Sequence, residues 1–462
     1  MGCIEAIFPK IPHAHCRRIF LGIGLRVMTK RTIRLFNTHP NACADASRTV
    51  EVSCQINPNY KSNRDSQRPP HTSLAAVLGL LILGLPSSAL AGPHPAPVAH
   101  PEAYKEIDLV SDQPSMARFQ DPNLINPWGL AVGPEGGLWT ADNGSGNATH
   151  YGPAGVQKPF DIVIASPPPG NMTGNTTGNT TGNTTMPAHP TGEVFNAHPR
   201  KFSGDTLIFA TEDGAIVGWQ KSDGNTSVLR VNNSGGNSVY KGLAQADTAD
   251  GPRLYATDFH NARIDVFDGN YATANTTGNF TDPNAPSGYA PFNILNVGDK
   301  LVVTYAKQDA AKHDEVDGGG NGLINIFNTD GTFVRRFATG TDAGGNVTSL
   351  NAPWGLAVGP EEFGRARSHL LVGNFGNGQI ATFDAAGNFT GFLLLKDGTP
   401  LTIPGLWAIV PEQRGMEGDP KRLYFTAGPD SEAHGLFGVI QQTGTVPPPR
   451  DHDGDDDDHD GD

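Results

Sequence analysis

Nearly the same phrase occurs twice in the chain, and this repetition constrains the fold more than any other feature. Residues 126–134 read NPWGLAVGP, and residues 351–360 read NAPWGLAVGP, which places Trp128 and Trp354 at matching positions. Each copy opens a longer unit in which short apolar stretches alternate with turns rich in Asp, Asn and Gly. That alternation predicts four short strands joined as a β-meander. One such unit cannot bury its faces alone, so neighbouring copies must cover each other.

Four further segments follow the same template less completely, which gives six units between about residues 128 and 442. They are residues 207–224, 242–270, 292–337 and 405–440. Abundant glycine (57) and proline (37) and only 17% charged residues favour strands and turns over long helices. We therefore predict an all-β fold, a six-bladed β-propeller of four-stranded antiparallel blades. A strand within residues 104–119 would complete the last blade, because an open array would leave hydrophobic edges exposed.

The stretch LYATDFHNARIDVFD (254–268) resembles the NHL-type repeat, in which a strand ends at an Asp turn and Asn-x-Arg-Ile leads into the next strand. The region 128–442 as a whole resembles an uncharacterised bacterial secreted family that carries the WGLAVGP signature. The resemblance implies the propeller fold and says little about chemistry.

The two ends of the chain differ in composition from the repeats. The apolar run LAAVLGLLILGL (74–85), followed by Ala89-Leu90-Ala91, is typical of a signal peptide with its cleavage site. We expect a leader at 1–91, whose upstream part either precedes the true start or is transit-like, then a linker at 92–103 and the propeller at 104–445. All four cysteines lie in the leader, so the folded part has no disulfide. A low-complexity loop at 166–190 and an acidic disordered tail at 446–462 complete the chain.

Charge and motifs limit the classes of function. A net charge of −14 argues against nucleic acid as a partner. We expect a secreted, periplasmic or extracellular monomer with no membrane span after cleavage, which binds a small molecule, a glycan or a protein. The sequence has no GxSxG elbow, no HExxH and no P-loop, and no catalytic residue can be assigned.

The turns between the second and third strands are predicted to gather around the central channel, so their polar residues are the candidate ligand-binding set. Most of these turns contribute Asp, Glu or Asn. The set is Asp142, Asn143, Glu212, Asp258, His260, Asn374, Phe375 and Asp430. His260 and His434 are also candidate general bases, although a lone histidine in a turn is more often structural.

Two interpretations of these turns remain open. A ring of oxygen ligands could hold Ca²⁺ and support a hydrolase of the lactonase or esterase type. Asp and Asn also recur in turns simply because they hydrogen-bond their own backbone. We therefore expect a binding module of unknown ligand rather than an enzyme, with the Ca²⁺-dependent hydrolase as the alternative. The loop KHDEVDGGGNG (312–322) and the acidic tail could hold a cation, but a solvated segment is the simpler interpretation.

The repeated tryptophans also have two interpretations. Trp128, Trp354 and Trp407 could wedge between neighbouring blades as core, or form an aromatic patch at the channel mouth. The prolines and glycines around Trp128 and Trp354 favour packing.

Overall fold

The computed structural model describes residues 101–133, 136–168, 187–341, 347, 349–412 and 421–447. The expected leader, the repeat at 170–186 and the tail at 451–462 lie outside these residues. No α-helix occurs in the described ranges, and four 3-10 turns are present, at Phe202–Gly204, Lys221–Asp223, Ser234–Gly236 and Gly364–Ala366. None of these described segments forms a helix with the length and apolar character needed to cross a bilayer.

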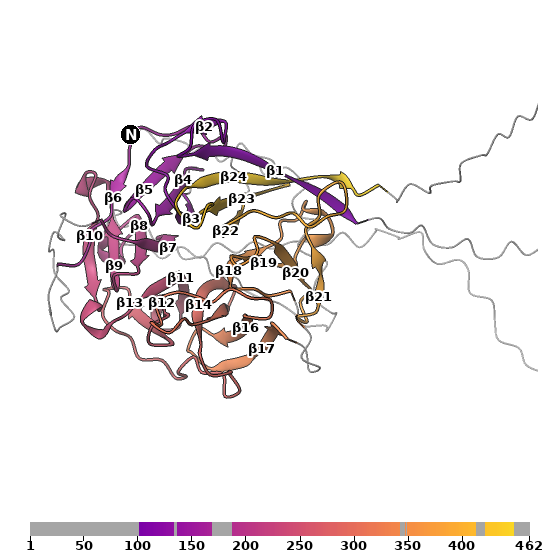
Figure 1. Ribbon diagram of the computed structural model, residues 1–462. Helices are drawn as coiled ribbons and strands as arrows, with labels where there is room; N and C mark the ends of the chain where they lie inside the picture. Colours follow the sequence, from indigo (N-terminus) through magenta and orange to yellow (C-terminus); the bar gives the residue numbers. More distant parts are fainter. Residues whose placement is uncertain are drawn as a thin grey trace, which may run out of the picture. The chain divides into compact units, whose positions relative to one another are not determined.

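Six sheets follow one another along the chain, each built as a meander, and the predicted all-β propeller is confirmed (Figure 1). Blade 1 contains β3 (Pro127–Val132), β4 (Leu138–Asp142), β5 (Asn147–Tyr151) and β6 (Ile162–Val163). Blade 2 contains β7 (Pro190–Phe195), β8 (Leu207–Thr211), β9 (Ala215–Trp219) and β10 (Val228–Asn232). Blade 3 has three strands, β11 (Tyr240–Thr248), β12 (Gly251–Asp258) and β13 (Arg263–Asp268).

The second half of the ring repeats this order. Blade 4 contains β14 (Tyr289–Val297), β15 (Lys300–Lys307), β16 (Leu323–Asn328) and β17 (Phe333–Thr339). Blade 5 contains β18 (Pro353–Val358), β19 (Leu370–Asn374), β20 (Ile380–Phe383) and β21 (Phe389–Phe392). Blade 6 contains β22 (Leu406–Pro411), β23 (Arg422–Ala427), β24 (Leu436–Thr445) and the N-terminal β1 (Glu102–Ser111), with the short β2 (Phe119–Gln120) beside β1.

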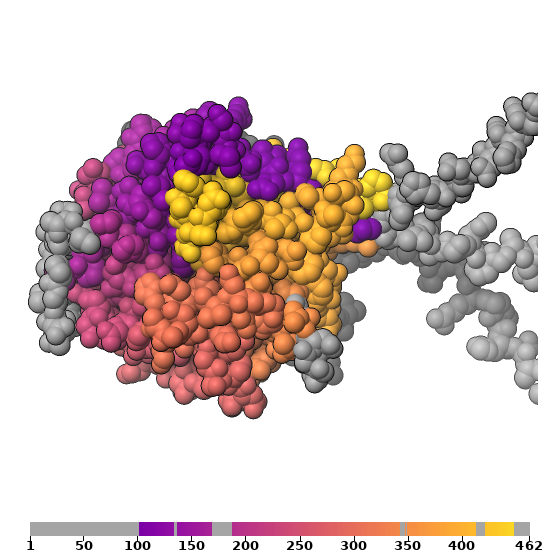
Figure 2. Space-filling model, viewed as in Figure 1, coloured from indigo at the N-terminus to yellow at the C-terminus, as the bar shows by residue number. Residues whose placement is uncertain are grey.

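The ring closes through β1, as the sequence predicted. β1 pairs antiparallel with β24 along its whole length, from Glu102 opposite Thr445 to Ser111 opposite Leu436. In Figure 2 the yellow C-terminal residues accordingly lie beside the indigo N-terminal ones. The innermost strands also contact one another in a full circle, in the order β3, β7, β11, β14, β18, β22 and back to β3. Closure therefore leaves no innermost strand without a neighbour on either side.

Each innermost strand contributes one side chain to the central axis, and we call these six residues the inner ring. Every one of these strands has a register shift beside that residue. The inner ring is Trp128, Thr191, Lys241, Phe292, Trp354 and Trp407. The glycine after each tryptophan of the repeated phrase is explained by closeness, because a Cβ on Gly129 would lie 2.5 Å from the Thr191 carbonyl oxygen. A Cβ on Gly355 would lie 2.7 Å from the Trp407 carbonyl oxygen.

The tryptophans pack as core on one another, and they do so between neighbouring blades, because blades 5, 6 and 1 are consecutive in the ring. Trp128 and Trp407 stack with ring centroids 3.5 Å apart, and Trp354 meets both rings edge-on at 6.0 and 5.8 Å. All three side chains are buried, so they form no exposed patch. Because blades from both halves of the chain meet in this contact, it joins residues far apart in sequence.

Trp407→Ala should lower the free energy of unfolding by about 3–5 kcal/mol, because it empties the fully buried centre of the stack. Phe389→Ala is the matched control, since that ring lies on a peripheral strand and is 45% exposed. Urea denaturation followed by fluorescence measures both variants. Equal losses in the two would show that the axial stack is not a special point of stability.

Candidate functional site

The residue that follows the second strand of each blade occupies an equivalent place at one end of the axis. In all six blades its backbone N–H donates to the carbonyl of a residue just before or at the start of the innermost strand, over 2.8 to 3.1 Å. We call these six residues the turn ring. They are Asn143, Glu212, Phe259, Gln308, Phe375 and Gly428.

The residue just before each turn-ring residue is the last residue of the second strand. Where this residue is Asp or Asn, its side chain makes hydrogen bonds within its own blade. Asp142 is fully buried and accepts hydrogen bonds from the Thr140 hydroxyl at 2.8 Å and the Thr149 N–H at 3.0 Å. Burial raises the pKa of Asp142 well above its usual value, against these hydrogen bonds. The candidates Asp142, Asp258 and Asn374 all hold this position, so their oxygens serve the blades.

Asp258 and Asn374 show the same local role. The Asp258 carboxylate accepts from the Ser238 hydroxyl at 3.0 Å and from the Asn261 amide at 2.8 Å. The Asn374 side chain accepts from the Asn351 N–H at 3.0 Å and donates to the Ser349 carbonyl at 2.8 Å. Within the part of the chain that the structure describes, neither side chain reaches a polar group of another blade.

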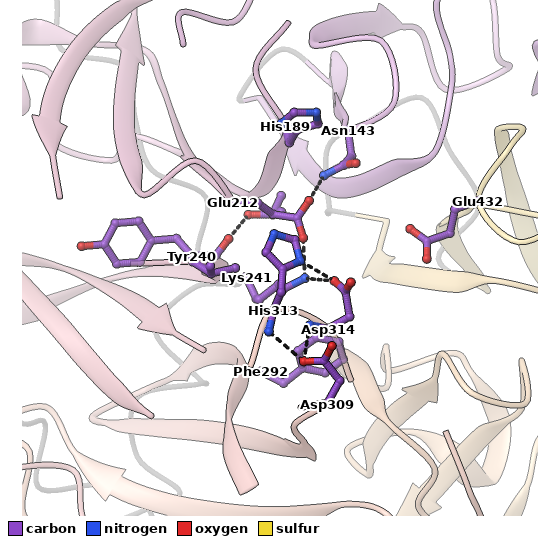
Figure 3. Close-up of polar contacts among 12 residues, drawn as sticks. Asn143, His189, Glu212, Tyr240, Lys241, Phe292, Asp309, His313, Asp314 and Glu432 are labelled. Carbon is purple, nitrogen blue, oxygen red and sulfur yellow. Dashed lines mark hydrogen bonds and ion pairs between the residues drawn. The ribbon is translucent and has the colours of Figure 1, made fainter. Parts of the chain in front are cut away.

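Asn143 and Glu212, by contrast, meet at the axis and join a larger cluster, which we call the axial polar group. The Asn143 amide donates to Glu212 at 2.8 Å, and the Asn126 amide donates to Glu432 at 2.7 Å. Asn126 in turn accepts from the Trp407 indole N–H at 2.9 Å, which ties the cluster to the inner ring. The group consists of Asn126, Asn143, Glu212, Lys241, His313, Asp314, Glu315 and Glu432. Figure 3 labels all of these except Asn126 and Glu315.

Lys241 is the centre of this group and the one charged member of the inner ring. Its side chain is fully buried, and its ammonium pairs with Glu212 and, at 3.2 Å, with Asp314. Nζ lies 4.8 Å from the centroid of the Trp128 ring, a cation–π contact. Burial alone lowers the pKa of Lys241, but the nearby carboxylates, Glu212 foremost, outweigh it and keep the pKa above its ordinary value. Lys241 is therefore a permanent cation.

Residues 308–322 bring the fourth blade to this lysine. The loop joins β15 to β16, and Asp309 anchors it by accepting from the His313 N–H at 2.9 Å. His313 and Asp314 pair at 2.8 Å. This hydrogen bond is the main cause that raises the pKa of His313, and it lowers the pKa of Asp314 against the effect of burial. The side chains are 47% and 62% exposed, so the group extends from the core to solvent.

Glu315 and Glu432 are the incompletely paired carboxylates of the group. Glu315 is half-buried and makes no hydrogen bond to another residue of the described chain. Burial raises its pKa to about 8; the charge of Lys241 opposes this rise, and the charges of Glu432 and Asp314 add to it. Burial also raises the pKa of Glu432, and Figure 3 shows its carboxylate pointing toward the rest of the group. Glu432 has φ 67°, after Asp430 and Ser431 at 54° and 55°, so three consecutive residues hold the left-handed conformation, as Phe202 and Ser203 also do in blade 2.

The remaining candidates lie nearby without joining the polar group. Phe375 is half-buried and stacks on Trp407 with centroids 4.0 Å apart. His260 is half-buried and contributes its carbonyl to Gln308 at 3.3 Å, whereas Asp430 is exposed. The His434 ring pairs with Asp112 at 2.9 Å, and its backbone carbonyl accepts from the Asn126 N–H at 3.1 Å.

Sequence reasoning did not single out Lys241, Asn126 or Glu432 as site residues. For Lys241 a signal was present, because YKGLA (240–244) aligns with the repeated PWGLA and replaces a tryptophan by a cation. Glu432 has no such signal, since its turn is not shared by the other units.

A resident divalent metal does not fit this arrangement. Ligand atoms of Glu212, His313 and Asp314 lie within 4.8 Å of one another, which is close enough for a metal. The Lys241 ammonium, however, binds both of these carboxylates and supplies the positive charge they require. Ca²⁺ takes six to eight oxygen ligands, and the oxygens of Asp142, Asp258 and Asn374 are committed within their blades.

No family model matches the chain. Among known proteins, it is similar to uncharacterized protein R648 of Acanthamoeba polyphaga mimivirus, with 34% identity over 341 residues that cover 72% of this chain and 78% of the viral protein. Uncharacterized protein L690 of the same virus is 34% identical over 355 residues, which cover 73% of this chain and 85% of L690. These relatives are viral, so membership of a bacterial secreted family stays a prediction.

Solved propeller structures are similar at the level of the fold. A streptogramin B lyase has a TM-score of 0.40 at 13% identity, covering 74% of this chain and 97% of the lyase. The calcium-binding protein regucalcin from Agrobacterium tumefaciens has a TM-score of 0.44 at 11% identity, covering 76% of this chain and 98% of regucalcin. At such identities, we draw no activity or ligand from either protein.

Lys241→Met should lower the free energy of unfolding by about 3–5 kcal/mol, because it leaves Glu212 and Asp314 without their shared cation. The double variant Lys241→Met/Glu212→Gln should recover part of the loss. Lys300→Met, which removes a surface ion pair with Asp299, is the control and should change stability by less than about 1 kcal/mol. Urea titration compares the three, and equal losses for Lys241→Met and Lys300→Met would contradict the assignment.

Glu315→Gln should stabilise the protein selectively at alkaline pH. Because the folded-state pKa of Glu315 is raised from 4.5 to about 8, its contribution to stability is fully present below pH 4.5 and is lost as the pH rises through 8. The groups facing it, Lys241, Asp314 and Glu432, stay unchanged in the variant. Relative to the unsubstituted protein, the variant should gain about 2 kcal/mol between about pH 5 and about pH 9, after allowance for partial exposure. A pH-independent difference in urea denaturation would contradict this expectation.

Proposed function

The chain belongs to the same family as the mimivirus proteins R648 and L690, and from its own geometry we propose that it is a binding module whose ligand contacts the axial polar group. One observation carries the proposal: all six blades send side chains to the same end of the axis. Blades 1 to 4 supply Asn143, Glu212, Lys241 and Asp314, blade 5 supplies Phe375 and blade 6 supplies Glu432. A ligand at this end of the axis would have polar and aromatic groups from all six blades available to it.

The energetics of the group support a role beyond holding the fold. Glu315 and Glu432 have raised pKa values because burial and neighbouring carboxylates disfavour their charged forms. The positive φ angles at residues 430–432 also lower the stability of the folded state. Features that oppose stability and gather in one place are typical of binding sites.

The alternative remains a Ca²⁺-dependent hydrolase, and the observation that favours it is the metal-like spacing of Glu212, His313 and Asp314. The buried Lys241 ammonium between these carboxylates opposes it. Secretion after cleavage near Ala91 and action as a monomer accompany the binding proposal as further expectations.

A panel of small probes tests the proposal by thermal shift and calorimetry. The probes are N-acetyl-arginine amide, glucose, N-acetylglucosamine, citrate and CaCl₂. At least one probe should stabilise the protein, and its effect should disappear in Glu432→Gln but persist in Glu362→Gln, which changes an exposed carboxylate on the surface of blade 5. If no probe depends on Glu432, the binding proposal fails. If only CaCl₂ does, and Ca²⁺-dependent hydrolysis of a lactone or ester follows, the alternative replaces it.

A further inference from the structure

The axial polar group holds more carboxyl groups than basic groups, and because the pKa of Glu315 is raised to about 8, that carboxyl becomes negative at alkaline pH or when a cation binds beside it. Glu212, Asp314, Glu315 and Glu432 are opposed by Lys241 and by His313 when it is protonated. Asp309, which anchors the loop, adds another carboxylate beside His313. A surface with this balance attracts cations and repels anions.

The group already stabilises one organic cation, the ammonium of Lys241. Carboxylates of Glu212 and Asp314 contact that ammonium, and the aromatic faces of Trp128 and Phe259 lie 4.8 and 5.9 Å from Nζ. Carboxylates combined with aromatic faces are the standard surroundings of a bound ammonium or guanidinium. From Lys241 the carboxylates continue toward solvent through Asp314, whose side chain is 62% exposed.

Carboxylate oxygens remain unused on the outer side of the group. Glu315 has no hydrogen bond to another described residue, and the Glu432 contact to Asn126 occupies only Oε2. Phe375 stacks on Trp407, whose indole N–H donates to Asn126. Asn126 in turn donates to Glu432, so these contacts link the aromatic ring of Phe375 to the Glu432 carboxylate. Unused carboxyl oxygens and an aromatic ring together suit a cation that carries several N–H donors.

A buried hydrogen-bond donor without an acceptor also occurs in the inner ring, next to Lys241. The Trp128 indole N–H is buried, in a side chain only 2% exposed, and has no acceptor among the described residues. The same ring carries the Lys241 ammonium over its face. A buried N–H without an acceptor is unfavourable, so a ligand carbonyl or hydroxyl that reached it would be stabilised.

We propose that the axial polar group recognises a small organic cation, an ammonium or guanidinium borne next to a hydrogen-bond acceptor. This inference rests on the proposed binding function and names its ligand class. The cation lies between Glu315 and Glu432 against Phe375, and Lys241 stays in place as the counter-charge of Glu212.

Two matched pairs of probes test the charge requirement by isothermal titration calorimetry. N-acetyl-arginine amide is compared with N-acetyl-citrulline amide, which replaces the guanidinium by a neutral urea of the same shape. N-acetyl-lysine amide is compared with its Nε-acetylated form. Each cation should bind at least about tenfold more tightly than its neutral partner, and added salt should weaken the binding.

Substitutions test whether the cations bind at the axial polar group. Glu432→Gln and Glu315→Gln should each weaken the cations about tenfold or more, whereas Glu362→Gln should not. Both changes relieve repulsion between carboxylates, so the folded state is retained, which circular dichroism checks. If glucose or another neutral probe binds in a Glu432-dependent manner and the cations do not, the ligand class is wrong while the binding function stands. If nothing binds in that manner, both proposals fall.

Discussion

The packing of six innermost strands around one axis is the constraint on which the rest of the structure depends. At Gly129 and Gly355 the next strand is too close for any side chain, which explains why the tryptophan and glycine are repeated together. One side chain per blade then fills the axis, and Trp128 and Trp407 do so by stacking at 3.5 Å. This contact joins the first blade to the last, so axial packing and ring closure by β1 support each other.

Lys241 is the one charged side chain of the inner ring, and the axial polar group follows from it. A buried ammonium is tolerated only with partners, and Glu212 and Asp314 provide them from two other blades. Asp314 reaches the lysine because β15 and β16 are joined by residues 308–322 rather than by a short turn. The neighbouring carboxyl groups of Glu315 and Glu432 exceed, once ionised, what one ammonium can neutralise, and the proposed preference for cations rests on this surplus.

The fold could be predicted from the sequence because its cause is local and repeated. Each unit carries the strand and turn pattern of a meander, and Trp128 and Trp354 mark the same inner position. The candidate site could be predicted only in part. Asn143 and Glu212 meet at the axis, but the reach of the 308–322 loop and the inward position of Glu432 depend on contacts between blades, which no local pattern encodes.

The turns that follow the second strands show how one repeat serves both stability and recognition. Asp142, Asp258 and Asn374 end these strands and hold the turn by hydrogen bonds within the blade, so the identity of this residue is restricted. The next residue has its backbone N–H fixed in every blade, whereas its side chain takes no part in that hydrogen bond. That position is Asn, Glu, Phe, Gln, Phe or Gly in the six blades, because the fold restricts only its backbone. Chemical variation can therefore accumulate at the axis without disturbing the ring, and that is where the ionisable side chains of the axial polar group have gathered.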